Sequence, residues 1–186
     1  RKLEAGQLTV EREPTLLNDF FRSLTETFRP EAERRNIQLS YEYITDSAAP
    51  PPEIIEIDRV KQESILVNLM SNALKFTPEG GKVMIRLAAN DQEWALGITD
   101  TGKGIPAEQQ ERIFQRFARA HGADISGTGI GLSFVQDLTK LLDGTIGLHS
   151  EVGIGSTFSL QFPIIGASIY SVVEHAAIHE SSPLPA

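Results

Sequence analysis

The chain contains no cysteine among its 186 residues. Disulfide bonds and cysteine-ligated metal sites are therefore excluded. It also lacks a basic excess, since 25 acidic against 17 basic side chains give a net charge of −8. Binding of nucleic acid through a broad positive field needs the opposite balance, so we expect no nucleic-acid partner.

No apolar run approaches the roughly 20 residues that cross a bilayer, and no signal peptide opens the chain. We expect a cytoplasmic location and no direct membrane contact, whether or not a parent protein carries an anchor elsewhere.

Length and composition indicate one folded α/β domain. Apolar residues make up 40% of the chain and charged residues 23%, as in ordinary globular proteins. A chain of 186 residues buries a full core but divides poorly into two domains.

Strand-like and helix-like patterns alternate along the chain. Alternation and short apolar runs predict strands at residues 8–12, 37–44, 54–57, 82–89, 94–100, 145–150 and 157–162. Helical spacing predicts helices over residues 59–76, 106–112 and 129–142, and an earlier helix that starts at Pro14. That earlier helix carries an apolar stripe of Leu16, Leu17, Phe20, Phe21, Leu24 and Phe28.

The predicted helix 59–76 has two different faces, and Asp58 is placed to cap its start. At about 100° per residue, the apolar face holds Leu66, Leu69, Met70 and Ala73, with Gln62 on the same side. A second face holds Asn68, Asn72, Lys75 and Phe76. Magnesium prefers oxygen ligands and keeps most of its waters, so we interpret Asn72 as a metal ligand. Lys75 then offers a positive charge to phosphate.

Asp100 ends a predicted strand and opens the motif DTGKGI, residues 100–105. A carboxylate at a strand end can accept the proton of an adenine amino group. Gly102 and Gly104 have no Cβ, so the backbone can pass close to a base and adopt positive φ. Taken alone, such a motif is often only a turn.

A second glycine motif, GTGIGL at residues 127–132, precedes a predicted helix. Free N–H groups at a helix start favour anions, and the spacing fits neither the dinucleotide fingerprint nor the Walker motif. The preceding residues 118–126 are polar and without periodicity, and we interpret them as a lid over the ligand. Phe114 and Phe117 anchor the start of this lid.

These motifs occur in the order NLMSNALKF, DTGKGI, IFQRF, GTGIGL and GSTFSLQFP, the last at residues 155–163. In order and spacing the chain resembles the ATP-binding catalytic domain of sensor histidine kinases, within the larger group of gyrase-, Hsp90- and MutL-like ATPases. The resemblance covers roughly residues 1–165. It implies a Bergerat-type ATP-binding fold, which is an α/β (α+β) two-layer sandwich with a mixed, mostly antiparallel sheet and helices on one face. We expect residues 1–7 to end a dimerisation helix, residues 8–165 to form the catalytic domain, and residues 166–186 to be a tail or linker.

The resemblance also implies roles for single residues. Asp100 would fix adenine, Thr157 would support Asp100 through water, and Arg119 would approach the γ-phosphate. The implied catalytic residues are Asn68, Asn72, Lys75 and Arg119, with Mg²⁺ on Asn72. The implied ATP-binding residues are Asn72, Lys75, Phe76, Asp100, Gly102, Gly104, Ile105, Phe117, Gly127, Thr128, Gly129, Gly131, Leu132 and Thr157.

Three functions fit these motifs. One is a protein histidine kinase domain that passes the γ-phosphate of Mg-ATP to a histidine outside this chain. The second is a gyrase- or Hsp90-like ATPase, and the third is a nucleotide-binding module without turnover. ATPases of the second kind place a glutamate base one turn before the metal asparagine, where this chain has Asn68. The missing base favours phosphoryl transfer over hydrolysis, and serine-directed relatives remain a variant of the first function.

A histidine kinase implies protein partners as well as ATP and ADP. The resemblance implies a dimerisation and phosphoacceptor domain of the same parent protein and a response regulator receiver domain. The four histidines of this chain, His121, His149, His175 and His179, are interpreted as ordinary surface residues.

Overall fold

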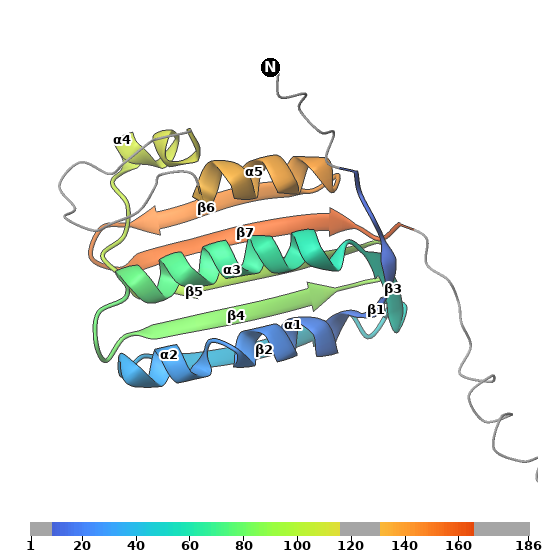
Figure 1. Cartoon of the computed structure of the whole chain (residues 1–186), viewed down its shortest axis with the longest axis horizontal. Helices are drawn as coiled ribbons and strands as arrows, with labels where there is room; N and C mark the ends of the chain where they lie inside the picture. Colours follow the sequence, from blue (N-terminus) through green and yellow to red (C-terminus); the bar gives the residue numbers. More distant parts are fainter. Residues whose placement is uncertain (1–8, 116–130, 166–186) are drawn as a thin grey trace, which may run out of the picture.

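A five-stranded sheet forms one layer of the protein, and helices cover one of its faces (Figure 1). The computed structural model describes residues 9–115 and 131–165. Across the sheet the strands follow the order β2 (Gln38–Thr45), β4 (Lys82–Ala89), β5 (Glu93–Asp100), β7 (Gly155–Pro163) and β6 (Thr145–Glu151). Only the β2–β4 pair is parallel among these neighbours. The predicted two-layer fold with a mixed, mostly antiparallel sheet is therefore confirmed.

The helical layer is built around one long central helix. The helices are α1 (Leu17–Glu26), α2 (Arg29–Arg34), α3 (Arg59–Phe76), α4 (Ala107–Gln110) and α5 (Gly131–Leu141), with a 3₁₀ turn η1 (Arg112–Phe114). A small antiparallel sheet of β1 (Glu13–Leu16) and β3 (Ile54–Ile57) lies at one end. In the part of the chain that the structure describes, no helix is long and apolar enough to span a bilayer.

Helix α3 has the predicted bounds, because its signals are local. The Asp58 carboxylate accepts a hydrogen bond from the Lys61 N–H at 3.1 Å and caps the helix. The predicted apolar face is buried in full: Leu66, Leu69, Met70 and Ala73. Gln62 is buried beside them, and its Oε1 accepts no hydrogen bond from the described residues. An acceptor left unpaired in the core lowers stability.

Aromatic side chains join the helical layer to the sheet. The Trp94 ring of β5 is 1% exposed. It lies 5.3 Å from the Phe21 ring of α1 and 4.5 Å from the Phe162 ring of β7. Each such pair contributes about 0.5–1.5 kcal/mol beyond its burial. These contacts hold α1 against β5 and β7 of the sheet.

The predictions near the start of the described chain are wrong in detail. Residues 9–12 are irregular, and the first strand is Glu13–Leu16, with α1 starting only at Leu17. Pairing with β3 sets this register, since Thr15 lies opposite Ile55 and both are buried. Leu16 consequently points outward and is 44% exposed. The predicted helix 106–112 is also divided, into α4 and η1.

Candidate functional site

The polar face of α3 borders the proposed site. Asn68, Asn72, Lys75 and Phe76 are all half-buried, whereas the core face of the same helix is fully covered. Asn68 to Phe76 spans about 12 Å along the helix axis at 1.5 Å per residue. The amide of Asn68 donates to the Ser64 carbonyl at 2.7 Å. Helical periodicity therefore predicted correctly which side chains share this face.

Asp100 lies at the end of β5 and is only 7% exposed. Its carboxylate accepts the Gly102 N–H at 2.8 Å. Burial raises the pKa of Asp100, and hydrogen bonds from the N–H groups of Gly102 and Ser156 partly oppose that rise. A buried carboxylate whose described donors are backbone N–H groups keeps accepting capacity for a ligand.

Glycine is required where the Asp100 turn meets α3. A Cβ on Gly102 would lie 2.7 Å from the Phe76 carbonyl oxygen, and 2.6 Å from the Asp100 carboxylate. Gly104 has a φ of +71° and packs against the backbone of Glu151. The turn therefore approaches the end of α3 more closely than any residue with a side chain permits.

Two lysines flank the Phe76 ring. The Nζ atoms of Lys75 and Lys103 lie 5.4 Å and 5.1 Å from the ring centroid. Both distances allow a cation–π interaction. Sequence reasoning missed Lys103, although its place inside DTGKGI was a signal. The ring thus lies under a local positive charge in a protein of net charge −8.

Thr157 does not lie where the resemblance implied. Its hydroxyl is 3.0 Å from that of Thr99, and Ser156 is the residue paired with Asp100 across the β5–β7 ladder. Side chains alternate between the faces of a strand, so Thr157 and Asp100 lie on opposite faces of the sheet. The polar neighbour of Asp100 is Ser156, which is buried and whose hydroxyl lies 2.8 Å from that of Ser150. Counting strand alternation from Phe158 would have put Ser156 on the buried face, but only the β5–β7 register sets it opposite Asp100.

The other end of the α3 face meets the start of α5. A Cβ on Gly131, the first residue of α5, would lie 2.9 Å from Asn68 Oδ1. Leu132 packs against the core next to this contact. Ile105 also packs against the core, and its N–H donates to the Ser150 hydroxyl at 2.8 Å. The structure therefore brings Gly102 and Gly131, one residue from each glycine motif, to opposite ends of the polar face.

Five predicted site residues lie outside the described residues: Phe117, Arg119, Gly127, Thr128 and Gly129. The proposed lid, residues 118–126, lies there as well.

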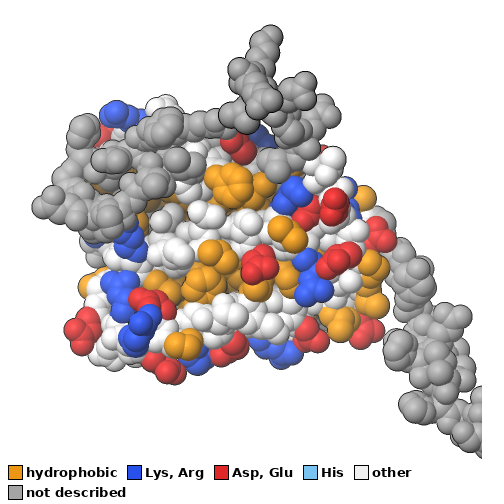
Figure 2. Space-filling model, viewed as in Figure 1, with side chains coloured by type: hydrophobic (Ala, Val, Ile, Leu, Met, Phe, Trp, Pro, Cys, Tyr) orange, Lys and Arg blue, Asp and Glu red, His pale blue; other side chains and the backbone are white. Residues whose placement is uncertain are grey.

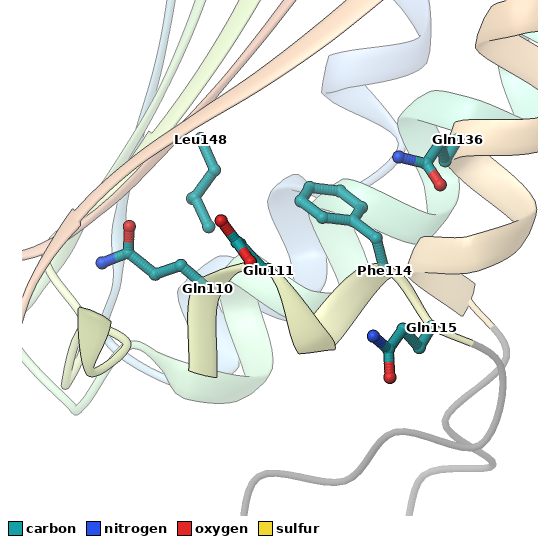
Figure 3. A pocket seen from close by; sticks show the side chains of 6 residues that line it. All are labelled: Gln110, Glu111, Phe114, Gln115, Gln136 and Leu148. Atoms are coloured by element: carbon teal, nitrogen blue, oxygen red, sulfur yellow. The ribbon is translucent and has the colours of Figure 1, made fainter. Parts of the chain in front are cut away.

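A separate hollow of about 440 Å³ lies between η1, α5 and β6. Figure 3 shows the side chains that line it: Gln110, Glu111, Phe114, Gln115, Gln136 and Leu148. No predicted nucleotide-binding residue is among these six, so this hollow is distinct from the α3 face.

The described residues fit an adenine nucleotide with magnesium. Asp100 supplies a buried acceptor for a base, Lys75 and Lys103 supply positive charge, and Asn72 supplies a neutral oxygen of the kind magnesium accepts.

The family profile described as "Histidine kinase-, DNA gyrase B-, and HSP90-like ATPase" matches residues 57–165. The chain belongs to this family. Sensor histidine kinase TmoS from Ectopseudomonas mendocina is 32% identical over 186 residues, which are 98% of this chain and 18% of TmoS. The chain therefore spans about a fifth of the length of this relative.

Solved structures agree with the assignment of this ATPase domain. Full-length ShkA, in a crystal structure with AMPPNP, superposes with a TM-score of 0.75 at 27% identity, over 88% of this chain and 34% of ShkA. The catalytic domain of histidine kinase ThkA superposes with a TM-score of 0.70 at 27% identity, over 83% of this chain and 96% of that domain. The relatives are histidine kinases, so the chain is a catalytic ATP-binding domain of the histidine kinase type, and the gyrase- or Hsp90-like alternative is not favoured.

Proposed function

We propose that this domain binds Mg-ATP on the polar face of α3 and transfers its γ-phosphate to a histidine of a dimerisation domain in the same parent protein. The observation that carries the proposal is the buried Asp100 carboxylate, which lies against the end of the helix that bears Asn72 and Lys75. Adenine at Asp100 and phosphate groups beside Lys75 and Asn72 would thus contact one continuous surface. The ShkA structure contains AMPPNP, an analogue of ATP, which supports the same ligand class here.

Each residue would have a role that follows from the chemistry of its side chain. Asp100 accepts from the base, while Lys75 compensates phosphate charge. Asn72 would hold Mg²⁺, which when bound supplies charge compensation for the transferred group. Arg119 and the backbone of residues 127–129 are proposed to contact the γ-phosphate. Positioning and charge compensation are the main contributions that phosphoryl transfer requires of a protein.

Two features favour transfer over hydrolysis. Asn68 stands where hydrolytic relatives would carry a glutamate base, and its amide is bound to the Ser64 carbonyl. Glu63, further back on α3, is exposed and lies on another side of the helix. An amide is not a base for water, so a hydroxyl or imidazole acceptor must come to the nucleotide instead.

The partners follow from this reaction. We propose a helical dimerisation domain of the parent protein as the source of the phosphoacceptor histidine. A response regulator receiver domain would then take the phosphoryl group. The proposed cellular location of the reaction is the cytoplasm, where ATP is available.

Asn72→Ala tests the metal assignment. Calorimetry with ATP, in the presence and absence of magnesium, should show a larger loss of affinity when magnesium is present. We expect a loss of roughly tenfold or more with magnesium, equal to about 1.4 kcal/mol. Ser71→Ala is a matched control, since Ser71 is the exposed neighbour of Asn72 on the same helix.

Equal losses with and without magnesium would assign Asn72 to packing or to phosphate. Absence of ATP binding by the unaltered chain would refute the proposed function as a whole.

A further inference from the structure

Arg35 lies outside every motif, yet its guanidinium reaches the last turn of α3. It donates to the carbonyl of Leu74, to that of Lys75 at 3.4 Å and to that of Thr77 at 3.2 Å. Arg35 follows α2 directly, some 40 residues before these partners in the sequence. One side chain therefore binds three carbonyls around Phe76.

These bonds complete the capping of α3. The last four carbonyls of a helix have no partner within the helix. The Ala73 carbonyl accepts from the backbone and hydroxyl of Thr77 at 3.1 and 2.7 Å. Arg35 satisfies the carbonyls of Leu74 and Lys75. The remaining carbonyl, that of Phe76, lies against Gly102.

The last turn of α3 is thus held between Arg35 on one side and the Asp100 turn on the other. The loop that carries Arg35 is itself fixed here, because the Asn36 carbonyl accepts the Gly80 N–H at 2.9 Å. Asn36 has a φ of +52°, which turns the chain back over the end of α3. The held turn carries Lys75 and Phe76, the residues nearest to Asp100 on the polar face.

The charge of Arg35 matters as much as its geometry. A helix C-terminus carries a partial negative charge of roughly half an electron. A nucleotide that binds on this turn brings negative phosphates to that end. The guanidinium offsets these carbonyl dipoles. Other Lys and Arg side chains lie between the ends of α2 and α3 on the helix face, with Asp and Glu side chains among them (Figures 1 and 2).

We infer that Arg35 is a positioning residue for nucleotide binding, which orients Lys75 through the carbonyls of the last turn of α3 and offsets the helix dipole there. This inference rests on the proposed function, since it assumes that phosphate binds beside Lys75. Arg35 itself does not contact the nucleotide in this assignment. Its effect on affinity must therefore pass through Lys75.

Arg35→Ala in the full chain should weaken Mg-ATP binding about tenfold, measured by calorimetry at neutral pH and corrected for any unfolded fraction. Arg35→Lys keeps the charge but loses the planar fork, so it should restore part of the affinity. Arg34→Ala is the matched control. Arg34 is the adjacent residue, and its guanidinium pairs with Glu31 on the exposed side of α2, so ATP affinity should not change.

A double-mutant cycle with Lys75→Ala separates positioning from general stability. If Arg35 acts through Lys75, Arg35→Ala should cost little further affinity in the Lys75→Ala background. A purely structural role would give the same loss in both backgrounds and would overturn the inference. Should Arg35→Ala fail to fold, Arg35→Lys carries the same cycle.

Unchanged ATP affinity in folded Arg35→Ala or Arg35→Lys would also overturn the inference while leaving the proposed function intact. Failure of the unaltered chain to bind Mg-ATP would instead refute the proposed function, so the two failures are distinguishable.

Discussion

At the scale of single residues, the buried Asp100 carboxylate lowers the stability of the fold while it offers an acceptor for the base of a nucleotide. Burial raises its pKa, and the N–H groups of Gly102 and Ser156 offset only part of that effect. For a carboxyl group with a raised folded pKa, its contribution to stability is present below the unfolded pKa. That contribution is lost as the pH rises through the folded pKa. At neutral pH the buried charge therefore opposes folding.

Asp100→Asn should separate these two effects. The amide carries no charge, so we expect the free energy of unfolding at pH 7 to stay equal or to rise. Adenine recognition should fall by about 1–3 kcal/mol, because the amide can turn a donor toward a donor of the base. Urea unfolding and calorimetry with ADP measure the two quantities. Unchanged nucleotide affinity would show that Asp100 does not bind the base.

At the scale of elements, α3 is tied down at both ends by residues from distant segments. Its cap Asp58 is buried and accepts from the Glu11 N–H at 2.9 Å and from Lys61 Nζ at 2.7 Å. The Lys61 ammonium also donates to the Thr9 carbonyl at 2.7 Å. These hydrogen bonds join residues 9–11 to the start of α3. Arg35 holds the opposite end of the helix.

Asp58→Ala should lower the free energy of unfolding by roughly 2–3 kcal/mol, since it removes the cap and leaves the Lys61 charge without its carboxylate. Burial alone would raise the pKa of Asp58, but hydrogen bonds from the Lys61 side chain and from the N–H groups of Glu11 and Lys61 outweigh it and lower the pKa. This stability is present above the unfolded pKa of about 4 and is lost as the pH falls through the lower folded pKa.

Urea unfolding from pH 7 to pH 2 should therefore show the difference between Asp58→Ala and the unaltered chain shrink in acid. Asp58→Asn keeps an acceptor for the cap and should be intermediate at neutral pH. A difference that stays constant over this range would exclude the charge of Asp58 as its cause.

At the scale of the whole molecule, only one face of the five-stranded sheet is covered by the described helices (Figure 1). We propose that the nucleotide binds on that side. His149 on β6 is exposed and lies opposite Thr157 in the ladder, which places it on the other face. A phosphate bound on α3 would therefore lie across the sheet from His149.

We therefore expect this chain to bind Mg-ATP without phosphorylating its own His149. Incubation with γ-labelled ATP, followed by mass spectrometry of the modified peptides, should leave that histidine unlabelled. Addition of the helical phosphoacceptor segment of the parent protein should produce label on the added segment. Stable label on His149 in the isolated chain would contradict this arrangement of the two faces.

Much of the local structure around the proposed site followed from the sequence, because its signals are local. A period of 3.6 residues defined both faces of α3 and its bounds. Asp58 directly follows the predicted strand 54–57 and has a side chain suited to cap a helix. Gly102, in the motif DTGKGI, stands where the backbone approaches α3 closely. Each of these properties depends on residues within a few positions along the chain.

Tertiary structure alone decided which distant residues meet. Register with β3 moved the first strand to Glu13–Leu16, and strand alternation placed Ser156 rather than Thr157 beside Asp100. Nothing in the surroundings of Arg35 in the sequence indicates that it binds the end of α3. Strand pairing, and capping by a residue some 40 positions away, depend on which distant segments come into contact in the folded chain. A local sequence pattern carries no information about those contacts.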